Sequence, residues 1–158
     1  MIRIRSYTPD DAAPLHALFH VAIHKGAAGH YTPAQRAAWS PSSQMPASWP
    51  TKLAALETRV ALRDREIAGF MAMTPEGYLD LAFTHPDHTR HGVATALHSA
   101  LLELARTRGL TRLTTHASLA ARAFFDRHGW QVTHAEKVAR GGETLDRFAM
   151  SLSLGPQT

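Results

Sequence analysis

The feature that most constrains this chain is the run from residue 78 to residue 108, in which a strand, a short loop and a long helix follow one another. Residues 78–84 alternate apolar and polar side chains, which predicts a half-buried strand. Residues 91–108 carry apolar side chains at helical spacing and predict the strongest helix of the chain, with Gly109 as its stop. Any fold for this chain must therefore combine a sheet with amphipathic helices.

The other predicted elements lie on both sides of this run. The patterns predict strands at residues 2–7, 59–63, 66–73, 111–115, 130–138 and 144–154, helices at 9–25, 33–39 and 118–128, and one or two helical turns within 49–56. Thr8 and Ser118 are the predicted N-caps of the first and last helices. Gly141-Gly142 is the predicted turn of the last hairpin. This order predicts a mixed-sheet α/β (α+β) domain.

Length and composition narrow the possible classes. The 158 residues suit one domain, predicted to span residues 1–154 with a short tail at 155–158. The absence of cysteine excludes disulfides and thiolate nucleophiles. The sequence has neither the apolar core of a signal peptide nor a run of about 18 apolar residues, so we expect a cytoplasmic protein without a membrane partner.

The net charge of +4 arises from scattered basic residues. No basic run with interleaved aromatic residues is present, so we expect no nucleic-acid partner. A modest positive charge equally suits a polyanionic small ligand.

The start of the long helix is a candidate anion site. A helix N-terminus leaves about four N–H groups unpaired and carries roughly half a positive charge. Gly92 has no Cβ, which allows a ligand to approach the backbone, and Arg90 could add a charge-assisted contact. These features predict a phosphate or pyrophosphate site, the alternative being an ordinary helix start with a convenient glycine.

Two motifs resemble the GNAT N-acetyltransferase family. Residues 83–94 resemble its acetyl-CoA-binding segment, (Gln/Arg)-x-x-Gly-x-(Gly/Ala), in which Gly92 and Ala94 match and Thr89 departs. Residues 117–130 are similar to the family's fourth helix, Ser/Asn-x-x-Ala-x-x-Phe-Tyr-x-x-x-Gly-Phe, although Phe125 stands where the tyrosine is usual. The order of elements also agrees over nearly the whole chain.

The resemblance implies a single GNAT-type domain. Its mixed, mostly antiparallel sheet would have about seven strands, with strands four and five splayed apart and helices on both faces. The implied reaction is direct acetyl transfer from acetyl-CoA to a small-molecule or peptide amine, without a metal. The alternative is an acyl-CoA-binding sensor or interaction module with little catalysis. Dimers are common in this family, so a homodimer is also an expectation.

The resemblance also assigns the cofactor site. Pyrophosphate would lie on the N–H groups of residues 90–95, and the pantetheine arm would run beside strand four, with the thioester carbonyl against a strand-four N–H. The implied cofactor-binding residues are Ala82, Phe83, Thr84, Thr89, Arg90, His91, Gly92, Val93, Ala94, Thr95, Ser118, Phe124 and Phe125.

Asp80 is the candidate general base, because aspartate is disfavoured in strands and an ammonium must lose a proton before it attacks a thioester. Strict alternation places Asp80 on one face of the strand with Tyr78, Ala82 and Thr84. It places Leu79, Leu81 and Phe83 on the other face. The alternative is a hydrogen-bonded structural carboxylate, for which a nearby arginine could be the partner. In that case Tyr78, the second candidate catalytic residue of this strand, or a water chain would act as the base.

Protonation of the leaving thiolate has no obvious donor. The tyrosine that is the family's usual acid is absent at Phe125, and Ser118 could serve by hydrogen bonding. The alternatives are that Ser118 is a plain N-cap and that the thiolate leaves unaided.

Aromatic residues ahead of the second strand are candidate acceptor-binding residues. Tyr31, Trp39 and Trp49 lie in the segment that lines the acceptor site in this family, with core packing as the alternative.

We expect no metal at either of two groups of histidines. His16, His20 and His24 have metal-ligand spacing but no matching carboxylate, so a solvated helix face is expected. His85, His88 and His91 flank the cofactor loop, and one of them could contact phosphate or ribose.

Overall fold

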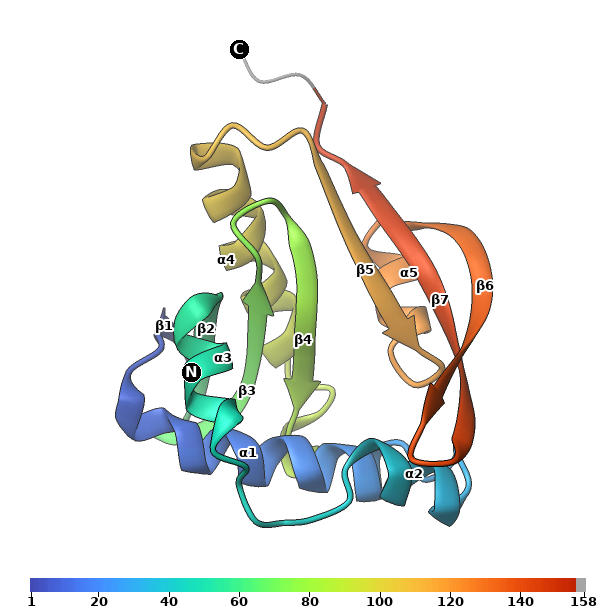
Figure 1. The fold of residues 1–158 in the computed structure, drawn as a ribbon. Coiled ribbons are helices and arrows are strands. Elements are labelled where there is room, and N and C mark those ends of the chain that lie inside the picture. The colour runs from blue at the N-terminus through green and yellow to red at the C-terminus, as the bar shows by residue number, and fades with distance from the viewer. Residues whose placement is uncertain (156–158) are drawn as a thin grey trace.

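A seven-stranded sheet runs through the computed structural model, which describes residues 1–155 (Figure 1). The strands are β1 (Ile2–Ser6), β2 (Glu57–Arg63), β3 (Glu66–Met73), β4 (Tyr78–Thr84), β5 (Arg112–Ser118), β6 (Gln131–Arg140) and β7 (Glu143–Ser153), in the order β1-β2-β3-β4-β5-β7-β6. All neighbours pair antiparallel except β4 and β5, which pair parallel. The predicted mixed, mostly antiparallel sheet is confirmed.

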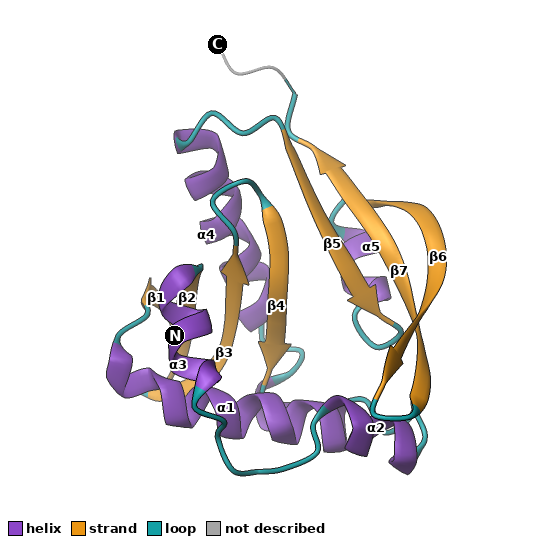
Figure 2. Ribbon diagram, viewed as in Figure 1, coloured by secondary structure: helices purple, strands orange, loops and turns teal. Residues whose placement is uncertain are grey.

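Helices cover both faces of the sheet, as predicted (Figure 2). They are α1 (Ala12–Val21), α2 (Pro33–Trp39), α3 (Ser48–Ala55), α4 (Val93–Thr107) and α5 (Arg122–Arg127). On one face, Leu97 of α4 and Phe125 of α5 pack in one buried cluster. On the other face, Leu15 of α1 and Leu53 of α3 pack against the opposite side of the sheet.

Strands β4 and β5 splay apart, which confirms the expectation. They share only the residue pairs Tyr78–Thr114 and Leu79–Thr115. Beyond Leu79 the two strands diverge, and Figure 1 shows the gap between them widening toward the end of β4. The backbone of β4 after Leu79 therefore lacks a strand partner on its β5 side.

A β-bulge at Asp80 overturns the predicted alternation of β4. Ala72 of β3 pairs with Leu81 and Met73 pairs with Leu79, so Asp80 has no partner in β3. As a result Leu79 packs with the α4 side of the core and Leu81 with the α1 side. The prediction that Leu79 and Leu81 share a face is wrong, because a bulge re-aims the side chains around it.

Three helix starts differ from their predictions. The first helix begins with a 3-10 turn at Pro9–Asp11, so α1 proper starts at Ala12, and a π-helical turn, Ala22–Gly26, follows it. Helix α4 starts at Val93 rather than at residue 91. Helix α5 starts at Arg122, because Ser118 remains paired in β5.

No helix among residues 1–155 is long and apolar enough to cross a membrane. Of the predicted tail at 155–158, only Gly155 is described, and residues 156–158 lie outside the described part of the chain.

Candidate active site

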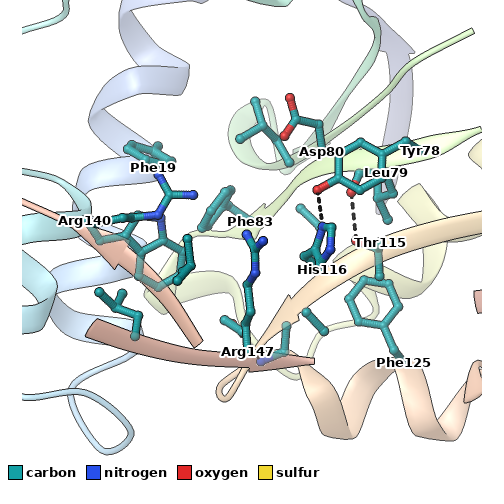
Figure 3. A pocket seen from close by; sticks show the side chains of 18 of the residues that line it. Phe19, Tyr78, Leu79, Asp80, Phe83, Thr115, His116, Phe125, Arg140 and Arg147 are labelled. Carbon is teal, nitrogen blue, oxygen red and sulfur yellow. Dashed lines mark hydrogen bonds between the residues drawn. The ribbon is translucent and has the colours of Figure 1, made fainter. Parts of the chain in front are cut away.

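Two cavities adjoin at the gap between β4 and β5. One, here the β7 cavity, has a volume of about 190 Å³ and extends between β4, β5 and β7 (Figure 3). The other, here the α4 cavity, has a volume of about 250 Å³ and reaches Thr89 and Ala94 at the start of α4. The residues that line both are Trp39, Ala82, Phe83, Ser118, Ala121 and Phe125. A ligand that follows β4 from the α4 cavity therefore arrives at the β7 cavity.

The start of α4 is built by an unusual backbone turn. Gly92 has φ 84° and Arg90 has φ 64°, both left-handed, and only glycine adopts such a conformation at little cost. The N–H of Ala96 donates to the carbonyl of Gly92 at 3.0 Å. The preceding N–H groups, of residues 93–95, belong to the part of a helix that lacks internal acceptors. Thr89 donates its hydroxyl to the Pro86 carbonyl at 3.1 Å and so fixes the loop.

Eight of the predicted cofactor-binding residues line the α4 cavity: Ala82, Phe83, Thr84, Thr89, Ala94, Ser118, Phe124 and Phe125. Arg90, His91, Gly92, Val93 and Thr95 do not line it, although they lie in the same loop and first helical turn. The side chain of Val93 is buried in the core, so this residue can offer a ligand only its backbone.

Asp80 lines the β7 cavity, as predicted. One of its oxygens, Oδ2, lies 3.3 Å from Nζ of Lys52 in α3, and its side chain is 29% exposed. The partner of Asp80 is thus a lysine and not an arginine, and the alternative of a structural carboxylate stays open. Lys52 also lines the cavity, which places an ion pair at its wall.

Tyr78 of β4, His116 of β5 and Glu136 of β6 form a hydrogen-bonded chain, and Figure 3 shows the link between Tyr78 and His116. Its hydroxyl lies 2.7 Å from Nδ1 of His116, and Nε2 of His116 lies 2.9 Å from Oε1 of Glu136. A carboxylate can only accept, so Nε2 carries the hydrogen and Nδ1 accepts the hydrogen bond from Tyr78. Arg147 donates its Nε to the same Glu136 oxygen at 3.1 Å and holds it in place.

Burial and nearby charges keep both Tyr78 and His116 neutral. Burial, followed by the charge of Arg147, lowers the pKa of His116, so the imidazole is neutral at pH 7. Burial, followed by the charge of Asp80, raises the pKa of Tyr78, so its hydroxyl keeps its proton.

Ser118 and Phe125 lie where the two cavities meet. Ser118 Oγ accepts the N–H of Ala121 at 3.1 Å, so the serine does cap a turn, although the turn precedes α5. Its own hydroxyl hydrogen has no acceptor among residues 1–155 and remains available. Phe125 is 2% exposed and packs edge-on against Trp130 at 5.0 Å, and it brings no polar group to this junction.

The three predicted acceptor-binding aromatics line the β7 cavity and also pack in the core. Tyr31 is buried, donates its hydroxyl to the Asp146 carbonyl at 2.7 Å and accepts the N–H of Leu119 at 2.9 Å. Trp49 is buried and donates its indole N–H to a backbone carbonyl of α1. Trp39 is partly exposed and lines both cavities.

The predicted solvated histidine stripe on the first helix is wrong. His16 is 5% exposed and packs edge-on against Trp49. His20 Nδ1 is hydrogen-bonded to the Ser40 hydroxyl at 2.7 Å, and His24 Nε2 to the Ser40 carbonyl at 2.8 Å. The segment between α2 and α3 therefore covers this face, which the helix pattern alone could not show.

Two of the three histidines in the loop before α4 also make side-chain hydrogen bonds. His88 is buried between Arg63 and Glu66, and His85 Nδ1 accepts the N–H of Asp87. Only the His91 side chain is fully exposed among the three. Within residues 1–155, no group of three or more potential ligands could hold a metal ion.

The sequence analysis did not identify several ionisable residues around the β7 cavity, which include Lys52, His116, Glu136, Arg140 and Arg147. A signal for one pair was present, because a two-residue turn at Gly141-Gly142 fixes the hairpin register and places Glu136 opposite Arg147. His116 comes from β5, and no local pattern relates it to that hairpin.

Comparisons with known proteins point to one family. A family model described as "Acetyltransferase (GNAT) domain" matches residues 27–152. The chain is 35% identical over 149 residues to the uncharacterized N-acetyltransferase YafP of Escherichia coli (strain K12), and the match covers 94% of each protein.

Solved structures agree with this match. A GCN5-related N-acetyltransferase from Rhodopseudomonas palustris superposes with a TM-score of 0.92 at 32% identity, over 96% of this chain and 95% of that one. The acetyltransferase yncA of Salmonella typhimurium, solved with acetyl-CoA, has a TM-score of 0.72 at 17% identity, over 100% of this chain and 96% of that one. The latter likeness concerns the fold.

Proposed function

Because the chain belongs to the GNAT acetyltransferase family, we propose that it transfers an acetyl group from acetyl-CoA directly to an amine. The observation that carries the proposal is the junction of the two cavities at the β4–β5 gap. One cavity begins at a helix N-terminus suited to phosphates, and the other holds acid–base side chains.

The cofactor would occupy the α4 cavity. Its pyrophosphate would accept hydrogen bonds from the N–H groups at the start of α4, with Gly92 giving the turn its shape. Its pantetheine arm would run beside Phe83 and Thr84, where β4 has no strand partner on the β5 side. The thioester would then reach the junction lined by Ser118 and Phe125.

The reaction requires the acceptor nitrogen to lose two protons. The amine attacks the thioester carbon, the C–S bond breaks, and the sulfur leaves as a thiolate. Asp80 would take the proton that converts the bound ammonium to a nucleophilic amine, because it lies at the bulge and lines the cavity.

Tyr78 would accept the second proton while it passes its own to His116. Nδ1 of His116 already accepts a hydrogen bond from Tyr78, and Glu136 would stabilise the imidazolium that forms. His116 is partly exposed, which would allow the proton to reach solvent.

Ser118 would donate a hydrogen bond to the leaving thiolate. Its oxygen is held by the Ala121 N–H, and its hydroxyl hydrogen is available at the junction. Phe125 offers no such group in place of the family's usual tyrosine.

The test is release of free thiol from acetyl-CoA across a panel of amines. We expect Asp80→Asn to lower kcat/KM for the amine at least tenfold, because a positioned base typically contributes a factor of about 10²–10⁴. It should leave acetyl-CoA affinity nearly unchanged. The matched control is Asp10→Asn, since Asp10 is an exposed carboxylate ahead of α1.

Binding of acetyl-CoA without thiol release from any amine would instead support the acyl-CoA-binding module. Full activity of Asp80→Asn with an unshifted pH profile would refute the base assignment. A homodimer and a cytoplasmic location stay predictions.

A further inference from the structure

We infer that the acceptor is an amine that also carries an acid group, which Arg140 and Arg147 bind. This inference rests on the proposed function and names the substrate class of the same site. Both guanidinium groups point into the β7 cavity from the β6–β7 hairpin (Figure 3).

Arg147 is held so that one edge stays available. Its Nε donates to Glu136 at 3.1 Å, and its side chain is 25% exposed. Its two terminal nitrogens make no hydrogen bond or ion pair with residues 1–155. An arginine fixed at one edge presents its remaining donors in a planar geometry that matches a carboxylate or phosphonate.

Arg140 supplies a positive charge that no group among residues 1–155 neutralises by an ion pair. It is the last residue of β6, and its side chain has no ion pair or hydrogen bond among the described residues 1–155. Lys52 is paired with Asp80 and Arg147 with Glu136, while the other acidic residue that lines the cavity, Asp146, is paired with Lys137. The cavity therefore has one uncompensated cation, which complements one negative charge on a ligand.

The two arginines lie close to the proposed reaction site. Both line the same cavity as Tyr78. Burial raises the pKa of the Tyr78 hydroxyl, and the positive charges of Arg147 and Arg140 oppose this rise. An acceptor whose ammonium lies between Asp80 and Tyr78 could thus place an acid group a few bonds away on the guanidinium groups.

An aromatic wall would hold the body of the acceptor. The rings of Phe19 and Phe83 meet edge-on at 5.0 Å, and Trp39 lies 6.0 Å from Phe83. Phe19, Phe83 and both arginines line the same cavity. An apolar side chain on the acceptor would pack here, which favours a hydrophobic amino acid over a polyamine.

The test compares matched amines that differ in the acid group. Phenylalanine and phenethylamine share an amine and a ring, and 2-aminoethylphosphonate and ethylamine form a second pair. We expect kcat/KM to be at least tenfold higher for the acidic member of each pair. Phenylalaninamide, which keeps the shape without the charge, should behave as phenethylamine does.

Arginine variants test whether the preference for acidic amines arises from the arginines of the β7 cavity. We expect Arg140→Gln to reduce the ratio of kcat/KM between phenylalanine and phenethylamine at least fivefold, mainly through KM for phenylalanine. Arg3→Gln is the matched control, because Arg3 is exposed on β1, at the opposite edge of the sheet, and should leave the ratio unchanged.

The outcomes separate this inference from the proposed function. Equal turnover of both members of each pair, or a ratio that Arg140→Gln does not change, overturns the acid-group inference and leaves acetyl transfer standing. Failure of every amine in the panel to release thiol overturns both. If phenylalanine and glycine are both acetylated faster than phenylalaninamide, the negative charge of the acceptor rather than its aromatic ring determines the preference, which supports the inference.

Discussion

A single methyl group at Gly69 tests whether the start of α4 holds the cofactor. Gly69 lies in β3 directly beneath this helix. A Cβ built there would lie 2.9 Å from the Phe83 carbonyl oxygen, 2.9 Å from Val93 Cγ1 and 3.3 Å from Leu97 Cδ1. The Phe83 carbonyl belongs to the backbone of β4 and cannot rotate away, and the β-branched side chain of Val93 is restricted to one main rotamer in a helix. Gly69→Ala must therefore shift β4 and α4 relative to β3.

The size of the displacement follows from contact distances. Carbon atoms pack best at about 3.5–4.0 Å, so Val93 must move by about 0.5–1 Å. Overpacking of this kind costs about 1–3 kcal/mol, of which the removal of a strand glycine offsets about 0.5–1 kcal/mol. The net cost is therefore about 0–2.5 kcal/mol. At about 2–4 °C per kcal/mol, we expect the melting temperature to fall by at most about 10 °C.

The effect on the cofactor should be larger. A shift of about 0.5–1 Å moves the N–H groups of α4 outside the 2.7–3.2 Å range of good hydrogen bonds to pyrophosphate. We therefore expect the affinity for coenzyme A to fall at least tenfold, or about 1.4 kcal/mol. Calorimetric titration with coenzyme A and a thermal melt of the same sample measure both effects.

The control is Gly29→Ala, since a Cβ at Gly29 meets nothing within 4 Å and its φ is not left-handed. It should change neither quantity. A Gly69→Ala protein that melts early but binds coenzyme A with unchanged affinity would refute the placement of the pyrophosphate on α4.

Three further variants test the junction and the core. Phe125→Tyr should hold or raise turnover, because Phe125 lines both cavities; a loss of about 1–3 kcal/mol of stability would show instead that the new hydroxyl is buried without a partner. Tyr31→Phe should lower the free energy of unfolding by about 1–3 kcal/mol in a denaturant titration, because Leu119 N–H and Asp146 C=O each lose a partner. Burial lowers the pKa of His98 from 6.5 to about 4, so the unfolded chain binds a proton that the folded chain does not. Stability should therefore fall as the pH drops from about 6.5 toward 4, and thermal melts of His98→Gln should show a flatter dependence.

The sequence predicts correctly those elements whose start, apolar face and end are all encoded in their own residues. Helix α4 carries its apolar stripe and its glycine stop in its own sequence, and the prediction of residues 91–108 differs from Val93–Thr107 only at the ends. The difference at the start is physical, because Gly92 adopts a left-handed conformation that no helix interior contains.

Elements fixed by long-range pairing were predicted less well. Strand β5 was expected to end at residue 115, but it continues to Ser118 because β7 pairs with it as far as Arg147. Because Ser118 is paired in β5, α5 begins later than predicted, and Ser118 ends a strand instead of capping α5. The partner strand lies about thirty residues later, so the local sequence does not contain this information.

The bulge at Asp80 shows the same limit at the candidate site. Alternation within β4 predicts one set of faces, whereas the register against β3 inserts an unpaired residue and changes the face of Leu79 relative to Leu81. Aspartate in a strand was the one local sign, since a residue that disfavours strand pairing is tolerated where pairing is lost.

The two interruptions of the sheet together explain why the polar groups gather here. The splay removes the strand partner of β4 beyond Leu79, and the bulge removes the β3 partner of Asp80. In a regular sheet both positions would be closed by hydrogen bonds and packed side chains. Instead, His116 on β5 and Arg147 on β7 reach the open space from one side and Asp80 from the other. The chemistry proposed for this protein thus depends on where the sheet fails to pair, and such positions are set by register between strands rather than by the pattern of any one strand.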